Sequence, residues 1–489
     1  MAIDPGLRRL ALRTLLPAFR GHRAPSWITD LIAEGVAGCI IFGYNIVDRD
    51  QLTALTGELR AVRTDLLLSI DEEGGDVTRL AHADGSPYPG NAALGAIDDV
   101  ALTERIYRAI GLDLLATGFT VNLAPTVDVN SVEDNPVIGT RSFGADPARV
   151  AAQSVAAVLG LQSVGVAACV KHFPGHGATN TDSHLALPTV DVGLDVLRER
   201  DLAPFAATIK AGTQAVMTAH IRVPALTGAM PATLSRAAMF DLLRRDLGFA
   251  GVVITDALEM HAAAAIAGGT AKAAAQALAA GNDLLCLGSR VDAALVEESI
   301  REIVAGIEAG WLPLTRVEEA AERVAGLAAW TLATRAAGPN EDGIGYPAAQ
   351  RALRIEGSLA GLGSPLIVQV LEAENDINIA VGPGVPWGLW PHLNGNEHVE
   401  VGYRAASVDA LRAAAGTRPI VVVGRNLHRM PGTARLIEEL AASHPVVAVE
   451  MGWPSSWRPA GVRAFITTFG ASRANGWAAA AALGLLPHA

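Results

Sequence analysis

Cysteine is scarce in this chain, because its 489 residues include only Cys39, Cys169 and Cys286. The three are far apart in the sequence, odd in number and surrounded by apolar residues. A disulfide framework needs paired cysteines, and a cysteine zinc site needs them at short spacing. We therefore predict three buried free thiols, without disulfides and without a cysteine-based zinc site.

The chain also lacks an excess of basic residues and a long apolar run. Its 38 Lys and Arg are outnumbered by 50 Asp and Glu, and a formal net charge of −12 argues against nucleic acid as a partner. The first 23 residues contain several Arg but no continuous apolar stretch. The Ala-rich stretch Ala262–Ala280 is interrupted by Lys272 and Gln276, which indicates a packed helix. We predict no secretory signal, no membrane span and a cytoplasmic location.

Half of the residues are apolar and 18% are charged, which is typical of a well-buried globular protein. The length exceeds that of one ordinary hydrophobic core, so two or three domains are expected. Residues 334–347 are rich in Gly, Pro, Asn and Asp, which indicates a linker. We therefore expect domains at residues 1–335 and 336–489.

Short apolar runs alternate with segments of helix-like spacing in the first domain, a pattern that predicts a parallel sheet. With one further strand, these runs predict an α/β fold of the (β/α)₈ TIM-barrel type, and a doubly wound open sheet is the alternative. The runs are Gly38–Phe42, Leu66–Ile70, Thr120–Leu123, Val166–Val170, Ala215–Thr218, Val252–Thr255 and Leu284–Leu287.

A second series of apolar runs follows the linker and predicts a smaller three-layer α/β domain. Its strand candidates are Pro365–Val370, Ile377–Val381, Ile420–Val423, Val446–Val449 and Ala464–Thr467.

Ionisable residues follow several of the first-domain strands. In a barrel the carboxyl ends of the strands lie on one face, where the active site is built. In an open sheet the same residues would spread along an edge, so their convergence favours the barrel. These residues are Asp71, Asp128, Arg141, Lys171, His172, His220 and Asp256.

Asp256 directly follows the apolar run Val252–Thr255. A carboxylate at the end of a barrel strand is suited to act as a nucleophile on an electrophilic carbon. Asp is also a preferred N-cap residue, so the start of a helix is the alternative. The other strand-end residues favour the catalytic interpretation.

The segment Lys171–Gly177, followed by Asp182 and His184, is the densest group of polar residues. A carboxylate two residues from an imidazole can orient it and stabilise its protonated form, so Asp182 and His184 could act as an acid/base dyad. An Asx-turn with an exposed histidine is the alternative.

The histidines also suggest a zinc site made of His172, His176, His184 and Asp182. A histidine pair four residues apart binds zinc when it lies on a helix. Pro174 and the neighbouring glycines disfavour a helix, so we prefer the dyad and expect no metal.

Acidic residues and a double glycine follow Leu66–Ile70 in the segment Asp71–Gly75, and Arg79 lies a few residues further on. These carboxylates could accept hydrogen bonds from sugar hydroxyls, and Arg79 could hold them or a substrate group. A solvated turn with a local ion pair is the alternative. Arg141 likewise could bind substrate or be structural.

Together these segments resemble glycoside hydrolase family 3, and within it the bacterial β-N-acetylglucosaminidases. The matching segments are IDEEGGDVTRL, NPVIGTRSFG, KHFPGHG, DSH and VVITDALEM. Their order fits the family, and KHFPGHG followed by DSH is highly specific. The resemblance covers residues from about 30 to 335 well and the C-terminal part only in outline.

The resemblance implies a retaining hydrolysis through a covalent glycosyl-enzyme intermediate. It makes Asp256 the nucleophile, His184 the general acid/base and Asp182 the dyad partner. Retaining glycosidases usually employ two carboxylates, and a histidine in the acid/base role is the habit of this subgroup. The positions that match sugar-binding residues are Asp71, Arg79, Arg141, Lys171 and His172.

We therefore expect an exo-acting β-N-acetylglucosaminidase (β-N-acetylhexosaminidase) that acts without a cofactor on muropeptide or chitooligosaccharide fragments. A β-N-acetylglucosaminide phosphorylase is the alternative, because a neutral base admits an anionic phosphate acceptor. A non-catalytic sugar-binding protein and a zinc hydrolase are less favoured. Since the barrel is expected to hold every matched residue, the second domain should serve in packing, oligomerisation or carbohydrate contact. The oligomeric state does not follow from the sequence.

Overall fold

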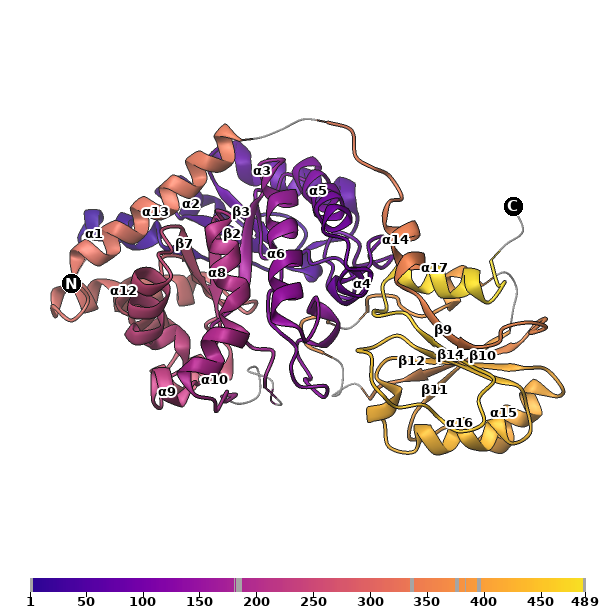
Figure 1. Ribbon diagram of the computed structural model, residues 1–489. Coiled ribbons are helices and arrows are strands. Elements are labelled where there is room, and N and C mark those ends of the chain that lie inside the picture. Colours follow the sequence, from indigo (N-terminus) through magenta and orange to yellow (C-terminus); the bar gives the residue numbers. More distant parts are fainter. Residues whose placement is uncertain are drawn as a thin grey trace. The chain divides into compact units, whose positions relative to one another are not determined.

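The computed structural model describes residues 3–179, 181, 187–334, 338–373, 378–382, 384–393 and 397–486. The chain folds as two compact units, which are described separately. The first comprises residues 1–72, 103–136 and 145–340, and the second comprises 73–102, 137–144 and 341–489. The division after residue 340 lies close to the expected linker, but two earlier segments also fold with the C-terminal part. Figure 1 shows one of them, α4 (Asn91–Ile97), beside α14 (Gly345–Ala352).

The first unit is built on a barrel-like parallel sheet, as predicted. Strands β2 to β7 are hydrogen-bonded in the order of the sequence, and β1 pairs with β8. The N–H of Ile40 donates to the Pro17 carbonyl at 3.1 Å, and a bridge joins Ile254 to Leu284, so both ends of the sheet meet the β1–β8 pair. The strands are β1 (Leu15–Leu16), β2 (Gly38–Ile41), β3 (Leu67–Ile70), β4 (Val121–Asn122), β5 (Ala167–Phe173), β6 (Ala215–Thr218), β7 (Val252–Thr255) and β8 (Leu285–Cys286).

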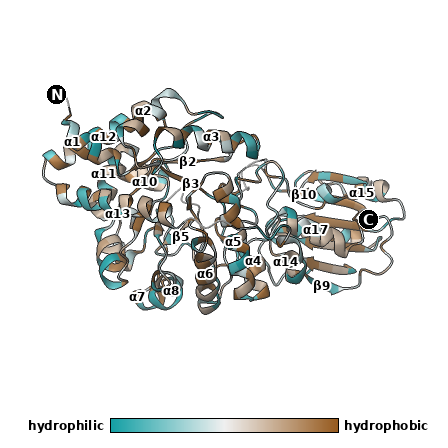
Figure 2. Ribbon diagram, turned by 90° about the horizontal axis from the view of Figure 1, so that it is seen from above, coloured by the Kyte–Doolittle hydropathy of each residue, from teal (hydrophilic) through white to brown (hydrophobic). Residues whose placement is uncertain are grey.

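All residues of these strands are buried, which explains why they appear in the sequence as nearly continuous apolar runs. The helices between them bury one side and expose the other, and Figure 2 shows hydrophobic and hydrophilic residues along the same helices. The principal helices of this unit are α1 (Pro5–Leu12), α2 (Ser26–Glu34), α3 (Arg49–Val62), α5 (Val100–Ala116), α6 (Pro147–Gln162), α8 (Ala203–Lys210), α10 (His261–Ala267), α11 (Thr270–Ala280), α12 (Ala293–Glu308) and α13 (Leu314–Ala333). The first turn of α5 belongs to the second unit.

The single helix predicted over Ala262–Ala280 was wrong, because α10 and α11 are separate. Gly268 and Gly269 between them have φ of 82° and 127°, a conformation that ends a helix and that glycine adopts most readily.

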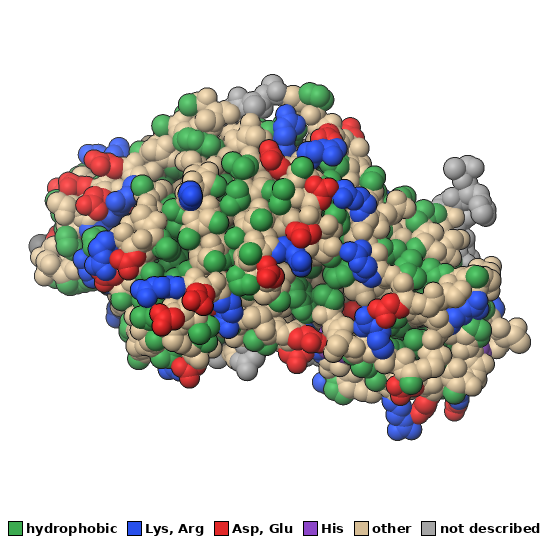
Figure 3. All heavy atoms as spheres, viewed as in Figure 1, with side chains coloured by type: hydrophobic (Ala, Val, Ile, Leu, Met, Phe, Trp, Pro, Cys, Tyr) green, Lys and Arg blue, Asp and Glu red, His purple; other side chains and the backbone are tan. Residues whose placement is uncertain are grey.

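The three cysteines are free and buried, as predicted, and burial raises the pKa of each thiol. Acidic and basic side chains are interspersed on the face in Figure 3. Among the described residues, no helix combines the length and hydrophobicity that a membrane span requires.

The second unit contains a six-stranded sheet in the order β11-β10-β12-β13-β14-β9, in which only β9 is antiparallel to its neighbour. Successive residues of β10 enter two hydrophobic clusters on opposite faces of the sheet. In Figure 1, α15 (Val408–Ala415) and α16 (Thr433–Ala441) cover one face and α17 (Arg473–Ala482) the other. The strands are β9 (Arg354–Gly357), β10 (Leu366–Leu371), β11 (His398–Gly402), β12 (Ile420–Gly424), β13 (Val446–Glu450) and β14 (Ala464–Thr467).

Two features of this sheet differ from the prediction. The strand predicted at Ile377–Val381 was wrong, because its described residues form a turn in which the Ala380 N–H donates to Asn378 Oδ1 at 3.0 Å. The strands β9 and β11 were missed because they lie at the two edges of the sheet, where exposed polar residues interrupt the apolar pattern.

Candidate active site

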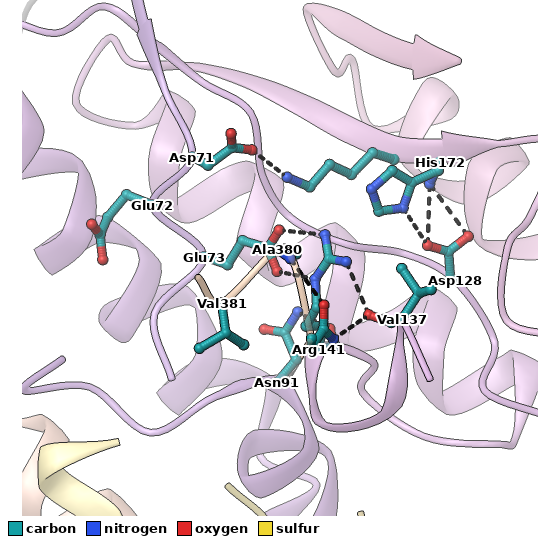
Figure 4. A network of polar contacts seen from close by, with 12 residues as sticks. Asp71, Glu72, Glu73, Asn91, Asp128, Val137, Arg141, His172, Ala380 and Val381 are labelled. Atoms are coloured by element: carbon teal, nitrogen blue, oxygen red, sulfur yellow. Dashed lines mark hydrogen bonds and ion pairs between the residues drawn. The ribbon is translucent and has the colours of Figure 1, made fainter. Parts of the chain in front are cut away.

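The carboxyl end of β3 carries Asp71, which forms an ion pair with Lys171 from β5. Lys171 Nζ lies 2.7 Å from Asp71 Oδ1 (Figure 4). The Lys171 side chain is 2% exposed, so its charge requires a partner, whereas Asp71 is 19% exposed. The pair therefore presents a partly exposed carboxylate, backed by a buried cation, at the strand end.

Lys171 and His172 lie at an irregularity of β5, where the pairing with β6 shifts register between Val170 and Phe173. Such a bulge redirects the side chains at the end of a strand. Val127 donates to the Lys171 carbonyl at 2.8 Å, which holds the irregular segment to the chain that follows β4.

Asp128 organises the loop that begins at His172. The carboxylate is fully buried and lies 2.7 Å from His172 Nδ1 (Figure 4). It also accepts the main-chain N–H of His172 at 3.2 Å and that of His176 at 2.6 Å. Because a carboxylate only accepts, Nδ1 of His172 carries the proton in this bond. Asp128 thus sets both the ring orientation and the tautomer of His172.

His176 is buried on the same loop and is kept neutral. Burial, and secondly the neighbouring His172, lower the pKa of His176 to about 4. Its Nδ1 lies 2.7 Å from Thr179 Oγ1, and the charge of Asp256 acts on the same ring. The backbone at Gly177 lies against the Val129 carbonyl oxygen so closely that a Cβ at this position would overlap it. The loop is therefore packed tightly up to Thr179.

Asp256 lies at the carboxyl end of β7 and is partly buried. Its N–H donates to the Thr218 carbonyl at 3.2 Å, and its Oδ1 accepts the N–H of Ala257 at 2.8 Å. The next helix, α10, begins at His261 with Met260 as its N-cap residue. Asp256 is therefore not the cap of that helix, which removes the structural alternative raised by the sequence.

His220 supports the residue next to Asp256. Its ring is fully buried, and Nε2 lies 3.0 Å from the Ala257 carbonyl oxygen, to which it donates. Nδ1 lies 2.8 Å from Thr233 Oγ1. The ring thus holds the peptide between Ala257 and Leu258, one residue after Asp256.

Arg79 and Arg141 belong to the second unit. Arg141 forms a bidentate pair with Glu73, with Nε and Nη2 at 2.9 and 2.8 Å from the two carboxylate oxygens (Figure 4). Both side chains are buried, at 6% and 2% exposure. Arg79 is partly buried and its Nη2 donates to the Ala380 carbonyl at 2.8 Å.

Comparison with known proteins identifies the family of the chain. The profile described as "Glycosyl hydrolase family 3 N terminal domain" matches residues 19–327. The chain belongs to glycosyl hydrolase family 3. The family predicted from the motifs is confirmed.

The similar curated proteins and solved structures include β-hexosaminidases and a β-N-acetylglucosaminidase. A β-hexosaminidase of Stenotrophomonas maltophilia (strain K279a) is 40% identical over 270 residues, which are 54% of this chain and 79% of that protein. β-Hexosaminidase A of Pseudoalteromonas piscicida is 39% identical over 259 residues, but the match spans only 43% of its length and 48% of this chain. A family 3 β-N-acetylglucosaminidase structure from Paenibacillus sp. str. FPU-7 superposes with a TM-score of 0.87 at 30% identity, covering 99% of this chain and 98% of that one.

The predicted site residues of this family 3 protein fall into three groups. Asp71, Lys171, His172 and Asp256 lie in the first unit at strand ends, and Arg79 and Arg141 lie in the second. Asp182 and His184 lie outside the described residues, so the dyad and the four-residue zinc site both stay untested. Within the described ranges, no three His, Cys, Asp or Glu side chains form a group that could hold a metal ion.

Two residues have larger structural roles than the sequence indicated. Asp128 was recognised as a strand-end acid, but its bonds to His172 and His176 connect residues 44 and 48 positions away. Glu73 was seen only as one of several acids after a strand, although it is the partner of Arg141. Contacts over such separations leave no periodic signal in a single sequence.

Proposed function

We propose that this family 3 protein is a retaining exo-β-N-acetylglucosaminidase that removes terminal β-linked N-acetylglucosamine. In this proposal the first unit is a (β/α)₈ barrel and the second a three-layer α/β domain. The observation that carries the proposal is Asp256, a partly buried carboxylate at the end of a barrel strand that does not cap the next helix. The likeness to β-hexosaminidases and to a β-N-acetylglucosaminidase structure supports the choice of sugar.

Asp256 would attack the anomeric carbon while His184 gives its proton to the glycosidic oxygen, so that the aglycone leaves and a glycosyl ester forms. His184 would then take a proton from water, whose oxygen attacks the anomeric carbon and releases the Asp256 carboxylate. Asp182 would stabilise the imidazolium form of His184, which is present before the first step and forms again in the second. No cofactor is needed, since the reaction requires only a nucleophile, an acid and a base.

The remaining predicted residues would bind the sugar. Asp71 can accept hydrogen bonds from hydroxyl groups, because Lys171 offsets its charge without enclosing it. His172, with Nδ1 directed to Asp128, would offer Nε2 as an acceptor. Arg79 and Arg141 would donate to sugar oxygens. Muropeptide and chitooligosaccharide fragments are the substrates we propose, and a cytoplasmic location stays a prediction.

The test is turnover of 4-nitrophenyl N-acetyl-β-D-glucosaminide by wild type and by Asp256→Ala. We expect release of free N-acetylglucosamine, initially as the β-anomer by NMR, and a loss of roughly 10³-fold or more in kcat for the variant. Asp195→Ala is a matched control, because its side chain is 96% exposed.

Three results would revise the proposal. Sugar 1-phosphate formed in phosphate buffer would identify a phosphorylase. Binding of N-acetylglucosamine without turnover would identify a sugar-binding protein. Activity that survives in Asp256→Ala would exclude this residue as the nucleophile.

A further inference from the structure

Asn378 connects the two arginines that are predicted to bind the sugar. It lies in the turn that replaces the strand expected at Ile377–Val381, and its side chain is partly buried. All contacts described below lie within the second unit.

The amide nitrogen of Asn378 supports Arg141. Nδ2 donates to the Val137 carbonyl oxygen at 2.8 Å, and Arg141 Nη1 donates to the same oxygen at 3.0 Å. A carbonyl oxygen has two lone pairs, so both donors can be satisfied together. Figure 4 shows Arg141 directed to this carbonyl and to Glu73. The guanidinium is thus held in its plane by Glu73 on one edge and by Val137 on another.

The amide oxygen of Asn378 supports Arg79. Oδ1 accepts the N–H of Ala380 at 3.0 Å, which closes the turn. The carbonyl of Ala380 then accepts Arg79 Nη2 at 2.8 Å, and the Val381 carbonyl lies 3.5 Å from Nη1. The turn geometry set by Asn378 therefore determines where these two carbonyl oxygens meet the guanidinium.

We propose that Asn378 is a positioning residue for sugar binding, because it ties Arg79 and Arg141 to one turn of the second unit. This inference rests on the proposed function, in which both arginines contact N-acetylglucosamine. Asn suits the position because one short side chain supplies both a donor and an acceptor. Asp would keep the acceptor and lose the donor, and Ala would lose both.

The test compares Asn378→Ala and Asn378→Asp with wild type on 4-nitrophenyl N-acetyl-β-D-glucosaminide. We expect Asn378→Ala to raise KM, and the inhibition constant of N-acetylglucosamine, by about five- to thirtyfold, with kcat changed less than threefold. The isosteric Asn378→Asp keeps the turn contact to Ala380 but sets a carboxylate oxygen against the Val137 carbonyl oxygen, so it should also raise KM. Arg458→Ala, which removes an exposed ion pair to Glu356 on β9, is the control for a general loss of stability in this unit.

A double-mutant cycle separates positioning from a merely structural role. If Asn378 acts through Arg79, introducing Asn378→Ala into the Arg79→Ala variant should have a reduced effect. We expect the factor by which KM rises there to be less than half of the factor that Asn378→Ala produces in wild type. Values of KM and of the inhibition constant within twofold of wild type in folded Asn378→Ala would overturn the inference, and so would additive effects of Asn378→Ala and Arg79→Ala in the cycle. If wild type itself does not turn over the substrate, the proposed function fails instead.

Discussion

Replacing Asp128 by Asn tests whether this buried carboxylate sets the geometry of the loop that begins at His172. The substitution keeps the shape of the side chain but removes its charge and turns one acceptor oxygen into a donor. With the amide oxygen at the Oδ1 position, the bond to the His176 N–H is kept. The amide nitrogen then faces the main-chain N–H and the Nδ1 of His172, which in wild type both donate to the Asp128 carboxylate.

The magnitude follows from these bonds. A hydrogen bond to a charged group contributes about 1.5–3 kcal/mol, and Asp128→Asn removes the one to His172 Nδ1. His172 would respond by moving its proton to Nε2, which converts the proposed sugar acceptor into a donor. Since each 1.36 kcal/mol corresponds to a factor of ten, we expect kcat/KM to fall about ten- to 150-fold.

The assay is release of 4-nitrophenol from the N-acetylglucosaminide, with circular dichroism to verify that the variant is folded at the assay temperature. Asp195→Asn, at the 96% exposed position, should match wild type. A folded Asp128→Asn protein whose kcat/KM stays within threefold of wild type would refute the reasoning about His172.

Two further predictions concern stability. Glu73→Gln removes the carboxylate charge paired with the buried Arg141 guanidinium and should lower the free energy of unfolding in urea by about 3–5 kcal/mol. Glu356→Gln, in the exposed pair with Arg458, should lower it by less than about 1 kcal/mol, and equal losses would show that burial is not decisive. The pKa of His176 is about 4 in the folded protein and 6.5 in the unfolded chain, so between these values only the unfolded chain binds the proton. Stability should therefore fall as the pH drops from 6.5 to 4, by up to about 3 kcal/mol from this group, and unfolding of His176→Gln across that range should be less pH-dependent. The exposed His398→Gln should keep the wild-type slope, and a His176→Gln slope equal to it would contradict the assignment.

The sequence predicted the first unit well because its signals are local. A strand buried on both faces appears as a continuous apolar run, and the seven runs coincide with β2 to β8 within a few residues. The two-residue strand β1 (Leu15–Leu16) is too short to stand out. In the second unit the edge strands β9 and β11 were missed because solvent-facing polar residues interrupt their pattern.

The candidate site was predicted residue by residue but not contact by contact. Asp71 and Lys171 were both proposed from their places after strands, yet their ion pair spans 100 positions and required the sheet order to be known. Asp256 could not be separated from a helix cap until α10 was seen to begin at His261. The contribution of Asn378 was hidden because its segment was interpreted as a strand, whereas its side chain accepts the Ala380 N–H in an Asx-type turn.

The division of the motifs between the two units changes how the C-terminal part should be understood. IDEEGGDVTRL begins in the first unit, but from Glu73 onward it folds with residues 341–489. Asp76 of this motif accepts the N–H of Ala471 after β14 at 2.7 Å, and its other oxygen accepts the hydroxyl of Thr140 at 2.7 Å. The segments that carry Arg79 and Arg141 are therefore attached to each other and to the second sheet by buried and partly buried polar contacts. The partners of both arginines come from their own unit, because Glu73 and Val137 bind Arg141 and the Ala380 carbonyl binds Arg79. Residues 341–489 therefore help to fix the conformation of two segments that the sequence had placed in the barrel domain.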